Sequence, residues 1–294
     1  PSTDLAKGPQ FLWQLTAMPQ YKGVAQTELF GQHSATPAIT TLYADLDGSG
    51  PHEIGVAILP GGSDSGPVGG ACVRGAAAGN DVEPAANFQR RNSVQCWGAA
   101  GKPVVGRSVT IVRLDTGEVL RVFGRKADLP QALIDANRIG ATETMLDSPM
   151  TGVPVVYPDT PGAVAQKVFI GDADGTIWRF DLTDTNPQNW TGNLFFDPYN
   201  QDVDKSATSY LDGQPLQLAP VVATDRLGAV VVGIATGDQE SFTASGSNYV
   251  YSITEKADPN TNKLRASVNW YVPYTLGDRP SGPMTIFHSV IYWA

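Results

Sequence analysis

One unit of sequence recurs along the chain and constrains the fold more than any other feature. Each copy begins with a small or polar residue and Pro, continues through a short apolar strand and a turn, and reaches an apolar run that ends in glycine. The prolines of the second, third and fourth copies, Pro149, Pro220 and Pro283, lie 71 and 63 residues apart. Recurrence of one supersecondary unit is typical of repeat architectures, in which each unit packs against its neighbours.

Each complete unit contains four short segments rich in Val, Ile and Tyr and bounded by Gly, Pro or Asp, which predicts a four-stranded antiparallel meander. The units begin near residues 36, 148, 219 and 282. We therefore expect an all-β fold, and more specifically a modified, quinoprotein-like β-propeller with four-stranded blades. Three complete units fall short of a closed ring of about four to eight blades. We expect residues 1–294 to form an incomplete ring, with further blades on both sides in a longer protein.

Two segments interrupt the repeat. Residues 61–106 form a long insertion of low β-propensity between two strands of the first unit, a kind of loop that often carries function. Residues 124–147 connect the first two units and contain a fair helical stretch, roughly Leu129–Asn137.

The insertion contains both cysteines of the chain, Cys72 and Cys96. Their spacing, without a CxxC pair or a nearby histidine, does not match a zinc site or a thioredoxin motif. The spacing favours a disulfide that cross-links the insertion in an oxidising compartment. Two unpaired thiols are the alternative.

An acidic loop between two apolar runs is the strongest candidate for a metal site. Oxygen atoms recur at its alternate positions, in the side chains of Asp45, Asp47, Ser49 and Glu53 and in the backbone carbonyl of Pro51. Calcium takes several hard oxygen ligands at once, and a glycine-containing turn points alternate side chains inward. We predict a calcium site here. The alternative is a solvent-exposed turn without an ion.

Two other acidic stretches are interpreted as structural. The cluster around Asp202, Asp204 and Asp212 contains a lysine and no glycine turn among its first members, so we expect an ordinary solvated surface. Residues 171–184 fit a strand, an Asp-Gly hairpin turn and a second strand, with Asp172 and Asp174 as turn formers. In the second strand the alternating apolar residues predict one buried face.

Charge and motifs exclude several classes of function. The net charge of −9 argues against nucleic acid, because phosphate binding depends on Lys and Arg. No apolar run approaches the roughly 20 residues that span a bilayer. The three histidines, His33, His52 and His288, lie in unrelated contexts, and the chain has no nucleophile elbow, phosphate loop or zinc-protease motif. We therefore expect a binding module and not an enzyme.

The second half of the chain resembles the C-terminal domain of the PilY-type type IV pilus-tip adhesins. The resemblance lies in KVFIGDADGTIWRFDLTD (167–184), LQLAPVVAT (216–224), VVVGIATGD (230–238), YVYSIT (249–254) and SGPMTIFHSVIYWA (281–294). It covers most of residues 148–294, and the first half only in outline.

The resemblance implies a propeller at the tip of type IV pili that acts in pilus extension and surface adhesion and is regulated by calcium. It further implies export through the periplasm to the cell surface, with minor pilins or pilus-tip subunits and a surface or host ligand as partners. Relatives commonly carry an acidic calcium loop just before the Gly-Asp strand, whereas residues 157–168 here contain Asp159 as their sole acid. We therefore expect the calcium site at Asp45–Glu53 instead.

Two other readings remain open. Tryptophan-bearing repeats also occur in quinoprotein dehydrogenases, whose cofactor lies on the propeller axis. The chain shows neither the vicinal cysteine pair nor the clustered contacts of such a site, so no quinone is expected. An integrin-like calcium-binding scaffold is the other alternative, and the sequence does not separate it from a binding module.

Overall fold

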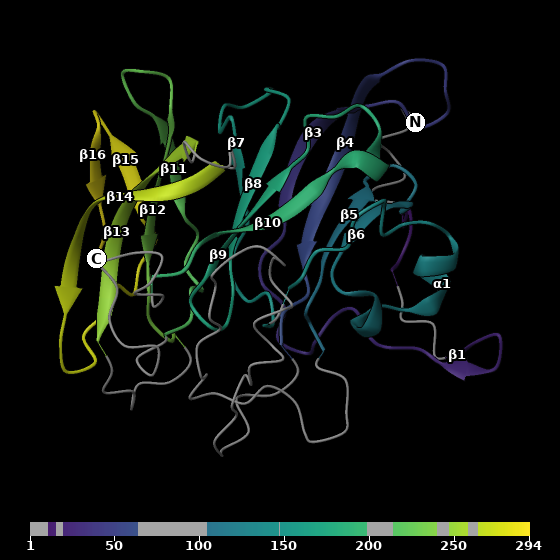
Figure 1. Cartoon of the computed structure of the whole chain (residues 1–294), viewed down its shortest axis with the longest axis horizontal. Coiled ribbons are helices and arrows are strands. Elements are labelled where there is room, and N and C mark those ends of the chain that lie inside the picture. Colours follow the sequence, from purple (N-terminus) through teal and green to yellow (C-terminus); the bar gives the residue numbers. More distant parts are fainter. Residues whose placement is uncertain are drawn as a thin grey trace.

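Nearly all regular structure in the chain is β-sheet. The computed structural model describes residues 11–15, 20–63, 105–146, 148–198, 214–239, 247–257 and 264–294. Three four-stranded antiparallel sheets and a C-terminal hairpin stand side by side in chain order (Figure 1). The all-β prediction is confirmed. Within the described residues the sheets do not close into a ring.

Each four-stranded sheet is a meander whose strands pair in chain order. The first sheet consists of β3 (Ala38–Ala44), β4 (His52–Pro60), β5 (Val109–Arg113) and β6 (Val119–Phe123). The second consists of β7 (Val155–Tyr157), β8 (Lys167–Gly171), β9 (Ile177–Asp181) and β10 (Thr191–Phe196). The third consists of β11 (Val221–Thr224), β12 (Val230–Ala235), β13 (Asn248–Ala257) and β14 (Leu264–Tyr274). The four strands of each predicted unit thus form one sheet.

Two hairpins and three short helical segments complete the described elements. The hairpins are β1 (Gln20–Tyr21) with β2 (Val24–Ala25), and β15 (Thr285–Phe287) with β16 (Val290–Tyr292). The helical segments are η3 (Lys126–Asp128), α1 (Gln131–Asp135) and η4 (Pro187–Asn189). The helix expected at roughly Leu129–Asn137 is therefore shorter than predicted. Pro130 occupies its N-cap, and Asn137, with φ of 55°, lies just beyond its end.

The core lies between consecutive sheets. One cluster joins residues of the first sheet, such as Ile58 and Ile111, to Trp178 and Phe180 of the second. Another joins Phe169 of the second sheet to residues of the third. The second sheet therefore buries both faces against its neighbouring sheets, which explains why apolar residues in its strands do not alternate strictly with polar ones.

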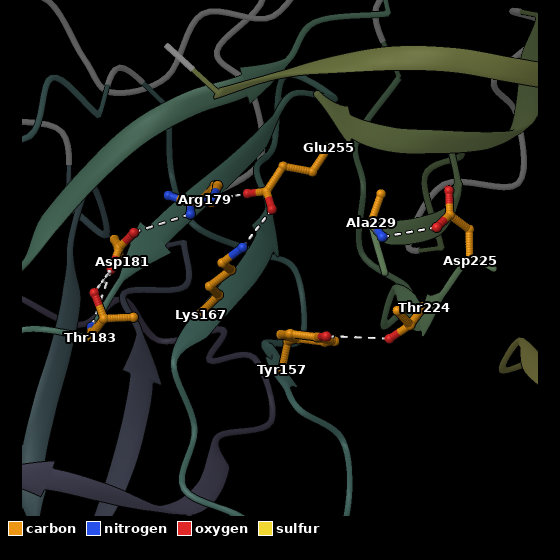
Figure 2. Close-up of polar contacts among 9 residues, drawn as sticks. All are labelled: Tyr157, Lys167, Arg179, Asp181, Thr183, Thr224, Asp225, Ala229 and Glu255. Atoms are coloured by element: carbon orange, nitrogen blue, oxygen red, sulfur yellow. Dashed lines mark hydrogen bonds and ion pairs between the residues drawn. The ribbon is translucent and has the colours of Figure 1, made fainter. Parts of the chain in front are cut away.

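The predicted buried face of β9, with Trp178 and Phe180, is confirmed, and the opposite face of the strand is buried as well. Arg179 lies between Trp178 and Phe180 and is 5% exposed. Its side chain binds Glu255 of β13 in the third sheet, and Glu255 also accepts a 2.5 Å ion pair from Lys167 of β8 (Figure 2). The second sheet therefore packs apolar groups on both sides and adds a buried ionic link on the side of the third sheet.

The first strands of consecutive sheets contact each other. These contacts join β3 to β7, β7 to β11 and β11 to β15. The backbone N–H of Ala165 donates to the carbonyl of Thr41 at 2.8 Å, which joins the first two sheets directly. Tyr157 at the end of β7 contacts the hydroxyl of Thr224 in β11 at 3.2 Å (Figure 2). The first strands therefore share one side of the assembly, where the segments that lead into and out of the sheets meet.

A candidate binding hollow between the sheets

Glycines allow three connecting segments to pass in backbone contact at this meeting point. The N–H of Gly62, just after β4, donates to the carbonyl of Met150 at 3.0 Å, and the N–H of Met150 donates to Gly106 at 3.0 Å. A Cβ atom at Gly62 would lie 2.2 Å from the carbonyl oxygen of His33, and one at Gly106 would lie 1.9 Å from that of Gly62. Both glycines also have positive φ, so no other residue suits these positions.

Next to this contact is a hollow of about 210 Å³ lined by His33, Ser34, Ala35, Ser63, Thr151, Gln217 and Gln239. Its residues come from the segments that precede β3, β7 and β11 and from those that follow β4 and β12. Among the described residues of the lining, the polar side-chain groups are hydroxyl, amide or imidazole groups.

Hydrogen bonds hold part of the lining in place. His33 and Ser63 exchange two backbone hydrogen bonds of 2.8 Å. The backbone N–H of Gln239 donates to the side-chain oxygen of Gln217 at 2.5 Å, and the side-chain amide of Gln239 donates to the carbonyl of Pro280 at 3.0 Å. Within the described residues, the amide nitrogen of Gln217 and the amide oxygen of Gln239 make no hydrogen bond. One donor and one acceptor therefore remain for a ligand or for water.

Thr151, one of the lining residues, has an enclosed side-chain hydroxyl. Its Oγ1 atom is buried and has no hydrogen-bond partner in the described part of the chain. A buried polar atom without a partner costs about 1–3 kcal/mol, and such atoms in native proteins are normally satisfied by water or a ligand. Because this oxygen has almost no accessible surface, its partner would have to be an enclosed water molecule and not a ligand in the hollow.

The acidic loop predicted to bind calcium is the turn between β3 and β4. Asp45 accepts a 2.7 Å hydrogen bond from the N–H of Gly48, and Asp47 accepts one of 2.9 Å from the N–H of Ser49. The hydroxyl and then the backbone N–H of Ser49 hold the pKa of Asp47 below its ordinary value of 3.8. Glu53 lies outside the turn, in β4 opposite Tyr43. The two aspartates thus act as turn formers.

The arrangement does not fit a bound calcium ion as it stands. The described residues contain no group of three or more carboxylate, His or Cys side chains placed to share a metal ion. Glu53 and His52 instead line a separate hollow of about 330 Å³ with Arg113 and Asp115. Arg113 pairs with Asp115 there at 2.5 Å and would oppose a cation. Calcium binding at Asp45, Asp47, Ser49, Pro51 and Glu53 therefore stays a prediction.

The turn at 172–175 is confirmed as structural. Asp172 is completely buried, and its carboxylate accepts hydrogen bonds from the N–H of Asp174 at 3.0 Å, the N–H of Thr176 at 2.8 Å and the indole of Trp178 at 3.1 Å. The carboxylate organises the turn and anchors the strand that follows.

The other predicted sites are separate from the hollow or lie outside the described residues. Cys72 and Cys96, the predicted disulfide, lie outside the described residues, as does the cluster at Asp202, Asp204 and Asp212. The three histidines occupy different places. His33 lines the neutral hollow, His52 lines the charged one, and His288 stacks on Phe287 with ring centroids 4.1 Å apart.

Sequence reasoning missed the hollow because its residues are ordinary polar side chains drawn from positions 33 to 239. Glutamine, threonine and serine carry no motif by themselves. The available signal was the glycine pair Gly61–Gly62 after β4, since paired glycines at the end of a strand indicate close approach of another backbone.

Comparisons with known proteins identify no relative. No family model matches the chain, and neither a curated protein nor a solved structure is significantly similar to it. Among the described residues there is no helix with the length and apolarity required to cross a bilayer.

Proposed function

We propose that the chain is a binding and assembly module of the bacterial cell surface that acts in type IV pilus assembly and surface adhesion. The pilus assignment rests on the ordered motifs between residues 167 and 294 that resemble the PilY-type adhesins. The binding assignment rests chiefly on the hollow, where the amide nitrogen of Gln217 and the amide oxygen of Gln239 offer hydrogen bonds that the described residues do not use.

The sheets are proposed to be blades of an incomplete β-propeller. Three observations support this: the strands of each sheet are consecutive, a core lies between each pair of neighbouring four-stranded sheets, and the first strands of neighbouring sheets contact each other. Propeller blades place their first strands around the central axis. The hollow would then lie at one end of that axis.

The proposed partners are minor pilins or pilus-tip subunits on one side and a surface or host ligand on the other. In this proposal the protein is exported through the periplasm and is extracellular, at the pilus tip or the outer cell surface. Calcium modulation through the loop 45–53 is a separate part of the proposal and is tested separately below. No quinone cofactor is proposed, and the quinoprotein dehydrogenase remains the alternative function.

Labelling of purified type IV pili by the gold-tagged chain, imaged by electron microscopy, tests the pilus assignment. We expect label at the tips of pili and retention of purified minor pilins by the immobilised chain. Absence of label, or label spread evenly along the shafts, would contradict it. Dye-linked dehydrogenase activity after incubation with quinone and calcium would instead favour the enzyme.

A further inference from the structure

We propose that two copies of the chain associate head to tail, with the C-terminal hairpin of one copy packed on β3 of the next. The contact joins two outward-facing sets of side chains. The hairpin face consists of Thr285, Phe287, Val290 and Tyr292, and the β3 face consists of Ile39, Thr41 and Tyr43. This inference goes beyond the proposed function and does not depend on the pilus assignment, because it uses only the packing of the sheets.

The hairpin β15–β16 packs on the third sheet with one face and exposes the other. Ile291 of β16 is half-buried and lies so close to the third sheet that a Cβ at Gly233 would be 2.9 Å from its Cδ1 atom. Successive residues of a strand point to opposite faces. Phe287 and its cross-strand partner Val290 therefore point away from the third sheet, as does Tyr292. Phe287 is 61% exposed, and the other two are exposed as well.

Strand β3 likewise buries one face and exposes the other, in the first sheet, which stands at the opposite end of the row from the hairpin (Figure 1). Leu42 and Ala44 are completely buried in the cluster shared with the second sheet. Ile39 and Tyr43 point the other way, and Ile39 is 70% exposed. The segment that follows β6 packs on Val122 of that strand and leaves the β3 face exposed.

The interior of the chain shows how two such faces fit together. Val155 and Tyr157 of β7 pack in one cluster with Val222 of β11, and Tyr157 also contacts the hydroxyl of Thr224. First strands of neighbouring sheets therefore meet through aliphatic and aromatic side chains. In the proposed contact, β15 of one copy takes the place of β7, and β3 of the next copy takes the place of β11. The occupant is a second copy because each copy supplies both halves of this contact.

Burial of the two apolar faces is the driving force for association. In stacked repeat proteins, polar outer faces on the terminal units keep the protein soluble, and neither of these two faces is polar. The faces differ from each other, so the contact is heterologous and leaves one free face of each kind on a dimer. The net charge of −9 opposes association, and salt screens that repulsion. We therefore expect association that strengthens with salt.

Two lysine substitutions block one face each. Phe287→Lys blocks the hairpin face and leaves the β3 face intact, and Ile39→Lys does the reverse. Both side chains are exposed, so the fold should keep its stability. Leu227→Lys is the matched control, because Leu227 is 93% exposed in the turn between β11 and β12 and lies on neither face. Lysine reduces the net negative charge, so a loss of association would not come from greater repulsion.

The experiment is sedimentation equilibrium of the whole chain over a series of concentrations in about 0.3 M salt, which screens the net charge. The average mass of the wild type and of Leu227→Lys should rise with concentration. Phe287→Lys and Ile39→Lys should each associate about tenfold more weakly or less, because a charge replaces an apolar side chain in the contact. An equimolar mixture of these two variants should form dimers and nothing larger, because the hairpin face of Ile39→Lys still fits the β3 face of Phe287→Lys.

Four results would overturn the proposal: the wild type stays monomeric, either face variant associates as the wild type does, Leu227→Lys also loses association, or the mixture forms no dimer or grows beyond one. Circular dichroism and thermal unfolding establish that each variant is folded. Tyr292→Lys and Tyr43→Lys form a second pair on the same two faces if either first variant does not fold. Pilus labelling involves different partners, so failure of that assignment is a separate result.

Discussion

Glu255 is the residue whose removal should most weaken the contact between the second and third sheets. Its side chain is 6% exposed, and its carboxylate binds Arg179 through one oxygen and Lys167, at 2.5 Å, through the other (Figure 2). The side chain of Arg179 is 7% exposed and that of Lys167 is 17% exposed, so Glu255→Ala would leave two largely buried cations without their shared partner.

Glu255→Ala removes a larger share of the interactions of Lys167 than of those of Arg179. Arg179 keeps a second ion pair with Asp181 at 3.1 Å, whereas the contact that Lys167 keeps with the described residues is a cation–π contact, 5.8 Å from the ring centre of Tyr157. Breaking a buried ion pair by removing one partner costs about 3–5 kcal/mol. Because Arg179 remains paired, we expect Glu255→Ala to lower the free energy of unfolding by about 3 kcal/mol, the lower end of that range.

Urea unfolding followed by circular dichroism measures the effect as a shift in midpoint at constant slope. In a double-mutant cycle with Lys167→Ala, the two residues should show a coupling of about 0.5–3 kcal/mol. Lys22→Ala is the control, since Lys22 forms a similar ion pair with Asp135, at 2.6 Å, but its side chain is 68% exposed. A midpoint shift for Glu255→Ala no larger than that of Lys22→Ala would refute the reasoning.

Three further predictions concern two strand glycines, acid stability and calcium. Gly171→Ala should lower the free energy of unfolding by about 1–3 kcal/mol or more, because its Cβ would lie 2.5 Å from the carbonyl oxygen of Leu216. Gly55→Ala, whose nearest new contact is at 3.5 Å, should leave the urea midpoint nearly unchanged, and equal shifts would contradict this. Burial raises the pKa of Asp181, but hydrogen bonds from Thr183 and the charge of Arg179 outweigh it, so the pKa lies below 3.8. The difference in free energy of unfolding between wild type and Asp181→Asn should therefore be constant well above pH 3.8. It should shrink as the pH falls through the lowered pKa of Asp181 in the folded state. A difference that shrinks as the pH rises would contradict a lowered pKa. In calorimetric titration with calcium, Asp47→Ala should abolish binding while Asp159→Ala leaves it intact. Absence of binding, or equal binding by wild type and Asp47→Ala, would remove the metal assignment.

The acidic loop shows why ligand spacing alone does not establish a metal site. Alternate oxygen groups at Asp45, Asp47 and Ser49 are compatible with calcium coordination, but short polar side chains also bond to the backbone N–H groups two or three residues ahead. In the folded chain Asp45 and Asp47 do the latter. Both arrangements obey the same local pattern, so the sequence predicts the turn and does not decide the ion.

The strands, their order in each sheet and the Asp-Gly turn at Asp172 were predictable from local sequence patterns. These features depend on neighbours within a few positions: β-branched runs, prolines and glycines that bound them, and hairpins that pair consecutive strands. The tertiary structure alone decided what lies between the sheets. Glu255 reaches Arg179 across 76 positions, and the hollow gathers residues from 33 to 239. Such contacts form only when whole sheets pack face to face. The alternation of residues within one strand does not predict which distant side chain that strand will contact.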